Sequence, residues 1–214
     1  MTRFLFVASF LIIGAVNAQR ATMPVQLLHY AIDSFSKGKV LLKTGAVSEQ
    51  VLNYNILTNE MIFNNDGKML AISDPKGVDT VFIQNRKFVP VNDKFYELLA
   101  AGPAPLFLEF TYKIDEPPVS VGYGNASQTT NATSVSSLVS RGQAYEIKLP
   151  DDFKVVPGYS YWIRKDDKYF KITNAKQLTS LFPEKKDAIN DFVKKNKTNF
   201  SKRDDLILLV KQIE

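Results

Sequence analysis

The sequence of 214 residues contains no cysteine, a single histidine and a single tryptophan. The lack of cysteine excludes disulfides, thiol nucleophiles and thiolate metal sites, and one histidine cannot form a cluster of imidazole ligands. His29 lies in an apolar context, and no Gly-x-Ser-x-Gly sequence supplies a nucleophile for it to activate. We therefore interpret His29 as a structural residue. A chain of about 200 residues can be stabilised by burial alone.

The sequence also lacks the glycine-rich loops that hold nucleotide phosphates. Gly122-Tyr123-Gly124 is followed by Asn-Ala-Ser rather than by a helical pattern, so it fails the context required of a phosphate loop. Adjacent acidic residues occur at 115–116, 151–152, 166–167 and 204–205. Neighbours in an extended chain point to opposite faces, and none of these pairs stands out as a catalytic pair. We expect no catalytic residue, no metal and no cofactor, and we predict that the protein is not an enzyme.

Long hydrophobic runs are missing after the first eighteen residues. Met1-Thr2-Arg3 gives a short basic start, residues 4–16 are apolar, and Val16-Asn17-Ala18 places small residues at a signal-peptidase site. The apolar run is too short to span a bilayer core of roughly 30 Å comfortably. We expect residues 1–18 to be a cleaved signal peptide. The mature protein would then be soluble in the periplasm or outside the cell, and not an integral membrane protein.

The charge is mixed, with a formal net charge of +5 and a pI near 9.2. Lys and Arg alternate with Asp and Glu, and export removes the usual nucleic-acid partner, so we expect no nucleic-acid binding. A mildly basic envelope protein can still be attracted to anionic glycans or lipid head groups.

Short apolar runs separated by turn residues predict an antiparallel β domain over residues 37–116, after an N-terminal arm at 19–36. Asn64-Asn65-Asp66-Gly67 predicts a hairpin, since Gly accepts the positive φ that such turns need. Residues 95–99 fit a strand or a helical turn, because periodicity is ambiguous over so few residues. The predicted strands are 40–42, 51–57, 60–63, 68–72, 78–83, 88–91, 95–99 and 106–112. Such a meander is typical of a sandwich or a partly open barrel.

A Ser/Thr/Asn-rich segment at residues 117–142 follows Pro117-Pro118. It cannot bury enough apolar surface to fold alone. Two interpretations remain, a linker and a long loop, and we favour the linker because long unstructured loops are uncommon within compact domains.

The last part of the chain, residues 143–214, predicts a strand at 144–149, a β-hairpin and a helical tail. The hairpin joins residues 159–164 to 169–172 around Lys165-Asp166-Asp167-Lys168. Asn174 is placed to cap a helix that runs to Phe182. The whole chain is thus expected to be α+β, with an antiparallel β meander followed by a β-hairpin and a C-terminal helical segment.

The aromatic strands supply the candidate ligand or partner contacts, Tyr161, Trp162 and Arg164. Alternation places Tyr159, Tyr161 and Ile163 on one face and Trp162 on the other. Trp162, together with Arg164 on its face, could stack on a sugar ring or contact a partner chain.

Two stretches resemble a group of exported proteins of unknown function from Gram-negative bacteria. One comprises residues 52–63 and continues through 79–83 and 86–88 to 95–97. The other comprises 181–186, 200–202 and 204–206. The resemblance covers most of the mature chain and implies a location in the bacterial envelope, but it carries no catalytic or ligand residue.

The sequence therefore predicts an exported, non-enzymatic envelope protein with a binding or scaffolding role toward an envelope protein or a glycan. Two alternatives stay open. One is a carrier of a lipid or other apolar ligand inside the curled sheet, and the other is a carbohydrate-active hydrolase that uses dispersed carboxylates.

Overall fold

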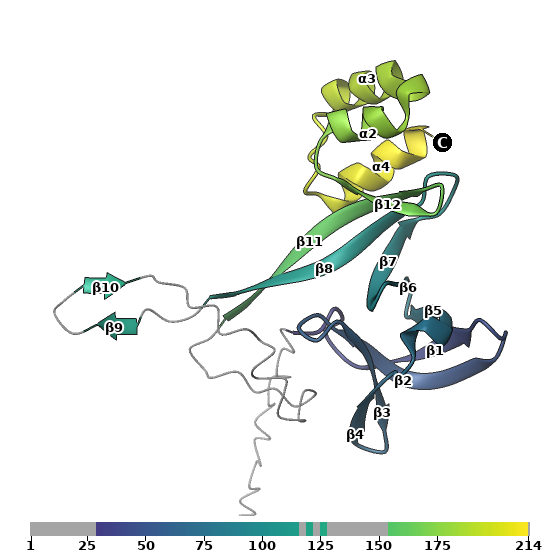
Figure 1. The fold of residues 1–214 in the computed structure, drawn as a ribbon, viewed down its shortest axis with the longest axis vertical. Helices are drawn as coiled ribbons and strands as arrows, with labels where there is room; N and C mark the ends of the chain where they lie inside the picture. The colour runs from purple at the N-terminus through teal and green to yellow at the C-terminus, as the bar shows by residue number, and fades with distance from the viewer. Residues whose placement is uncertain (1–28, 116–118, 122–124, 128–153, 214) are drawn as a thin grey trace, which may run out of the picture.

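The computed structural model describes residues 29–115, 119–121, 125–127 and 154–213. The predicted signal peptide, the strand expected at 144–149 and most of the Ser/Thr/Asn-rich segment lie outside these residues. The described part is an α+β fold in which one antiparallel sheet carries three helices at one end, as the sequence predicts (Figure 1).

The main sheet has ten strands in the order β12-β11-β8-β7-β6-β5-β1-β2-β3-β4. Two meanders, β1 to β4 and β5 to β8, meet where β5 pairs with β1. The region predicted as either strand or helical turn is strand β7. The ten strands are β1 (Ser36–Leu42), β2 (Val47–Asn55), β3 (Glu60–Asn65), β4 (Lys68–Ala71), β5 (Val78–Ile83), β6 (Arg86–Val91), β7 (Lys94–Ala100), β8 (Leu106–Asp115), β11 (Lys154–Lys165) and β12 (Lys168–Ile172).

Local turn chemistry explains the hairpins that the sequence predicts. In the β3–β4 turn the Asn64 side chain accepts a hydrogen bond from the Gly67 N–H at 2.8 Å, and Asp66 and Gly67 both have positive φ. In the β11–β12 turn Asp166 and Asp167 take the same left-handed conformation, which Asp tolerates better than most residues.

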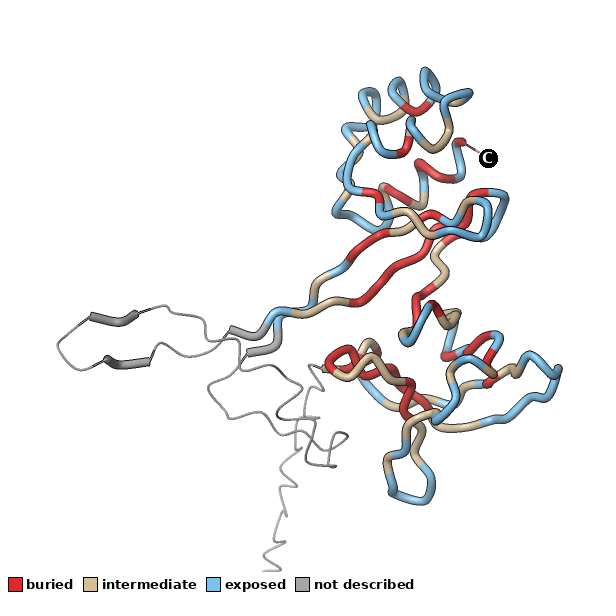
Figure 2. Tube along the Cα trace, viewed as in Figure 1, coloured by how far each residue is buried: buried red, intermediate tan, exposed pale blue. Residues whose placement is uncertain are grey.

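The sheet bends so that one face, the inner face, encloses the main hydrophobic core (Figure 2). Tyr54 of β2 meets rings from three distant strands, with centroids 6.1 Å from Phe88, 6.1 Å from Phe95 and 5.8 Å from Phe110. These contacts fold β2 over β6, β7 and β8. The opposite face, the outer face, carries a smaller cluster around Val91, Tyr96 and Phe107.

The chain just before β1 packs against β2. Ala31 N–H donates to the Tyr54 carbonyl and Ile56 N–H donates to the His29 carbonyl, both at 2.9 Å. Asn53 supports this contact, because its buried side chain bonds to both the N–H and the carbonyl of Ile32, at 3.2 and 2.7 Å. The described end of the expected arm is therefore part of the folded body.

The structure differs from the expected division of the chain at the Ser/Thr/Asn-rich segment. β8, before the segment, pairs with β11, after it, from Leu106↔Ile163 to Asp115↔Lys154. The strands on either side are thus neighbours in one sheet and share one core, so the segment connects adjacent strands and does not separate two bodies. Within it, β9 (Val119–Val121) and β10 (Asn125–Ser127) form a small antiparallel pair.

The helices α2 (Ala175–Leu181), α3 (Lys186–Asn196) and α4 (Arg203–Ile213) pack beyond β12 and β7 (Figure 1). Asn174 caps α2 as predicted, since its side chain accepts from the Gln177 N–H at 3.0 Å. Leu206, Leu209, Val210 and Ile213 of α4 are buried in the main core. Among the described residues, no helix is long and apolar enough to cross a membrane.

The close approach of β1 and β5 at Gly38 gives a test of this sheet order. A Cβ at Gly38 would overlap the backbone oxygen of Phe82 and lie 3.0 Å from the Leu52 side chain. We expect Gly38→Ala to lower the free energy of unfolding by about 1–3 kcal/mol, as overpacking does. The exposed neighbour Lys39→Ala should change it by less than about 0.5 kcal/mol. Urea unfolding of both variants measures the difference, and equal stability would contradict the β1–β5 contact.

Candidate functional site

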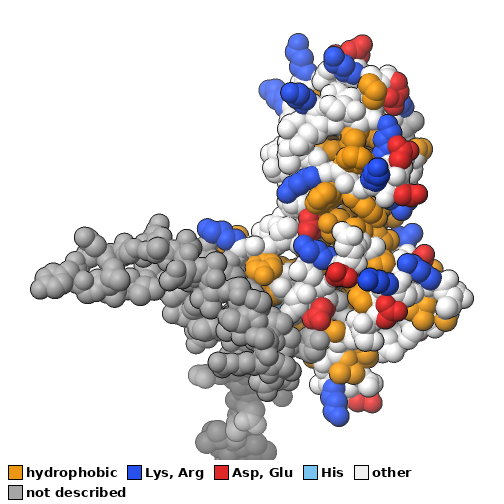
Figure 3. All heavy atoms as spheres, in the orientation of Figure 1, with side chains coloured by type: hydrophobic (Ala, Val, Ile, Leu, Met, Phe, Trp, Pro, Cys, Tyr) orange, Lys and Arg blue, Asp and Glu red, His pale blue; other side chains and the backbone are white. Residues whose placement is uncertain are grey.

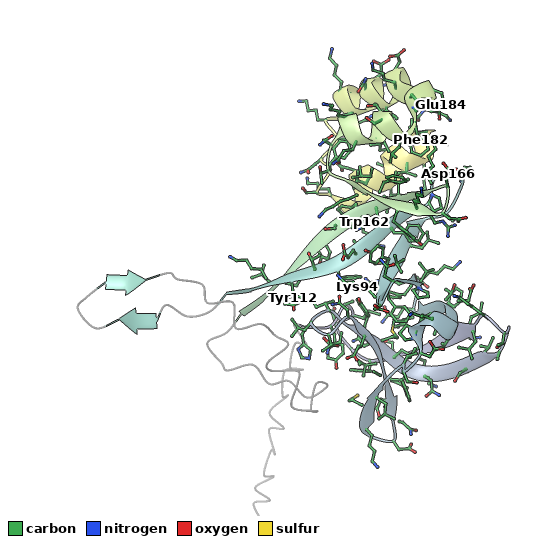
Figure 4. The ribbon with its side chains drawn as sticks, viewed as in Figure 1. Lys94, Tyr112, Trp162, Asp166, Phe182 and Glu184 are labelled. Atoms are coloured by element: carbon green, nitrogen blue, oxygen red, sulfur yellow. The ribbon has the colours of Figure 1, made fainter. Side chains whose placement is uncertain are left out.

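Strand β11, on which Figure 4 labels Trp162, presents the candidate contact residues on opposite faces of the sheet. Tyr161 is only 4% exposed and lies on the inner face. There its hydroxyl donates a hydrogen bond to the Ser201 carbonyl oxygen at 3.4 Å. Trp162 and Arg164 point to the outer face. The alternation predicted from the sequence is therefore present, and the three residues belong to two different sites.

The outer face carries a cluster of aromatic rings. The ring centroid of Tyr96 lies 5.9 Å from that of Trp162 and 5.9 Å from that of Tyr169. The Phe107 centroid lies 5.2 Å from the Tyr169 centroid and 5.9 Å from the Arg164 guanidinium carbon. Trp162 and Tyr169 are half-buried, whereas Phe107 is buried beneath them. The rings thus hold one another and Arg164 in place over β7, β8, β11 and β12.

Glu109, buried on the outer face of β8, fixes Trp162. Its carboxylate accepts from the Trp162 indole N–H at 3.0 Å and from the Lys94 ammonium at 2.8 Å. Lys94 begins β7 and Trp162 lies on β11, so Glu109 joins the strands on both sides of its own (Figure 4). A buried carboxylate needs such partners.

The environment of Tyr96 raises the pKa of its phenol. Burial is the largest cause, and the negative charge of Glu109 adds to it, so that the pKa reaches about 12. The folded protein therefore favours the protonated, neutral form of the Tyr96 side chain.

Next to this cluster lies a hollow of about 360 Å³, the Arg164 hollow. Three cations line it, Lys43, Lys87 and Arg164, together with one acid, Asp79. Tyr169, Phe107 and Leu98 supply the apolar part of its wall. The excess of positive charge makes this hollow suited to an anionic group.

A second hollow of about 500 Å³, the Phe82 hollow, lies over β1, β2, β3 and β5. Phe82 is exposed there, and the Lys87 ammonium lies 5.6 Å from its ring centroid. Because Lys87 lines the Arg164 hollow, the two hollows adjoin. The charges of the Phe82 hollow balance, with Lys37 and Lys39 against Glu49 and Asp66. Its remaining polar groups are the amides of Gln50, Asn64, Asn65 and Gln84.

On the inner face, the Glu97 carboxylate binds two arginines. Glu97, 1% exposed, accepts from Arg86 Nε at 3.0 Å and Nη2 at 2.7 Å, and from Arg203 Nη2 at 2.9 Å. Arg86 also donates to the Ala31 carbonyl at 2.6 Å. The network faces an inner pocket of about 310 Å³. No pattern in the sequence indicates this network, because Glu97 is one polar residue in an apolar strand and Arg203 lies 106 residues further on.

The two buried carboxylates do not form a catalytic pair. Glu97 faces the inner side of the sheet and Glu109 the outer side, and cations neutralise each of them. Within the described part of the chain, no group of three or more acidic or histidine side chains could hold a metal ion.

Comparison with protein-family models, with curated proteins and with solved structures finds no match. Function is carried by sites rather than by folds, so we infer it from these residues and their geometry.

Glu97 tests how far the inner network stabilises the fold. Removing one partner of a buried ion pair leaves uncompensated charge, so we expect Glu97→Gln to lower the free energy of unfolding by about 3 kcal/mol. This is the low end of the usual range, because Arg86 and Arg203 keep some solvent contact. The matched control is Glu49→Gln, whose ion pair with Lys39 is exposed and should contribute less than about 1 kcal/mol. Chemical denaturation compares the two, and equal effects would contradict a structural role for the network.

Tyr96 makes the stability of the folded protein depend on pH in the alkaline range. Its folded pKa, about 12, lies above the usual value of 10, so the unfolded chain loses this proton first as the pH rises. Stability contributed by the neutral phenol is complete below pH 10 and declines between pH 10 and about 12. We expect wild type to lose stability relative to Tyr96→Phe over that range, measured by urea unfolding from pH 8 upward. A constant difference would contradict the assignment.

Proposed function

We propose that the protein is an exported, non-enzymatic binding protein of the cell envelope whose outer face binds an acidic polysaccharide. The observation that carries the proposal is a row of outward side chains that crosses the sheet and links the two hollows.

The row follows directly from the strand register. On one side Lys39 opposes both Glu49 and Phe82, and Phe82 opposes Lys87. On the other side Phe107 opposes both Leu98 and Trp162, and Trp162 opposes Lys171. Lys87 and Leu98 line the same hollow and join the two halves. Directly opposed residues share a face, so cations and exposed or half-buried aromatic rings lie along this track, while Phe107 is buried beneath Trp162.

The length of the track favours a polymer over a single sugar. It crosses the eight strands from β2 to β12, which at about 4.8 Å per step extend over roughly 30 Å.

The two hollows favour different parts of such a polymer. The Arg164 hollow, with three cations and one acid, suits a carboxylate or sulfate group. The Phe82 hollow offers amides that can bond to sugar hydroxyls and an exposed ring on which a sugar can pack. A polysaccharide that carries both acids and free hydroxyls satisfies both hollows.

The geometry gives less support to the two alternatives. A carrier of a wholly apolar ligand needs an apolar cavity within the curled sheet. The rings of Tyr54, Phe88, Phe95 and Phe110 contact one another there, and the inner pocket beside them is lined by charged groups, namely Arg86, Glu97 and Arg203. A hydrolase needs two carboxyls facing one cleft, one of them with a raised pKa. Glu97 and Glu109 lie on opposite faces and are ion-paired, and of the two acids that line the Phe82 hollow, Glu49 is exposed and paired with Lys39. A binding role requires neither feature.

The test measures binding of defined polysaccharide probes to the full chain. Trp162 is the sole tryptophan and lies beside Arg164 on the outer face, so its fluorescence reports on the site. We expect a heparin octasaccharide to bind at low salt and weaken as salt rises, a heparin disaccharide to bind more weakly, and neutral dextran not to bind.

Variants locate the site. The double variant Lys87→Gln with Arg164→Gln should weaken octasaccharide binding at least about tenfold, which corresponds to about 1.4 kcal/mol. The matched control, Lys194→Gln with Lys195→Gln on α3, removes the same charge from the helical end. Equal losses in both double variants, equal binding of dextran, or no binding of heparin would each overturn the proposal.

A further inference from the structure

The inner pocket is built differently from the outer hollows, because a buried carboxylate orients its arginines. We propose that this pocket is a second, separate binding site for a small monocarboxylate that carries an aromatic or other apolar group. It lies on the other face of the sheet and does not depend on polysaccharide binding. Its lining residues are Ala31, Arg86, Glu97, Leu108, Phe110, Tyr159, Tyr161 and Arg203.

Arg203 is the group that would bind the carboxylate. It is the first residue of α4, and its side chain is 45% exposed although one N–H is held by Glu97. A guanidinium has five N–H donors in a planar fork, so Arg203 keeps further donors for an incoming carboxylate. Glu97 restricts the orientation of this fork before any ligand arrives, which reduces the entropy lost on binding.

Arg86 has a different role, because its donors are already committed. It contacts Glu97 through two nitrogens and the Ala31 carbonyl through a third. Its guanidinium also lies 5.2 Å from the Phe88 ring and 5.3 Å from the Phe110 ring. Arg86 therefore compensates Glu97 and keeps the carboxylate in place when Arg203 engages a ligand.

The charge balance favours a monoanion. Two arginines and one glutamate leave one positive charge in the pocket. Asp204 follows Arg203 at the exposed start of α4 and places a negative charge near Tyr161. This acid repels a dianion more strongly than a monoanion, and a dianion such as hydrogen phosphate would find only one uncompensated cation.

The walls favour an apolar body of limited size. Leu108 and Ala31 are apolar, and the Phe110 and Tyr159 rings meet edge to face at 5.9 Å. Tyr159 is 54% exposed, so its ring can cover a bound group. The volume of about 310 Å³ lies at the lower end of the usual range for ligand pockets, about 300–1,000 Å³, and excludes a polymer.

Calorimetry with benzoate and its neutral analogue benzamide tests the proposal on the full chain. We expect benzoate to bind, benzamide to bind at least tenfold more weakly, and inorganic phosphate not to compete. Arg203→Gln should weaken benzoate at least tenfold while keeping the fold, because Arg86 still pairs with Glu97. Tyr159→Ala, at an exposed position, should weaken benzoate without changing the preference over benzamide.

The matched control is Lys194→Gln, which removes one cation from the exposed surface of α3 and should leave benzoate binding unchanged. The proposal is overturned if benzamide binds as well as benzoate, if Arg203→Gln and Lys194→Gln have equal effects, or if benzoate does not bind. These outcomes are independent of heparin binding, so each site can fail without the other.

Discussion

The buried carboxylate of Glu97 holds together parts of the chain that are far apart in sequence. Through Arg86 it ties β7 to β6 and to the backbone at Ala31, and through Arg203 it ties β7 to the start of α4. Desolvating a charge costs several kcal/mol, and this cost is offset by two contacts with Arg86 and one with Arg203. The network therefore joins the sheet, the N-terminal segment and the start of α4 at one point.

Because the sheet bends, its two faces differ in how they are packed. Tyr54 brings β2 against Phe88, Phe95 and Phe110, so the inner face becomes the core. The outer face then lacks a second layer among the described residues, and its rings cover one another around Glu109. Since side chains alternate along β11, this strand contributes Tyr161 to the inner pocket and Arg164 to the outer hollow.

Local signals in the sequence were enough to predict the hairpins, the cap at Asn174 and the alternation along β11, because each depends on residues a few positions apart. The pairing of β8 with β11 was not predicted, since the polar segment between them carries no mark of which strands it joins. The Glu97 network was missed for the same reason. The role of Glu97 as the centre of an ion network becomes apparent only when the fold brings Arg203 beside it.

The two groups of cations differ in how they are held, and this difference decides what each can bind. Lys39 is exposed and Lys87 half-buried, and no buried carboxylate among the described residues restrains either of them. Both can adjust along a polymer, so affinity is spread over several weak and salt-sensitive contacts. Arg203 is restrained by a buried carboxylate and can offer its fork in few orientations. A restrained fork in a small pocket discriminates between ligands by shape and charge. Strand β11 thus contributes residues both to the adaptable outer surface and to the selective inner pocket.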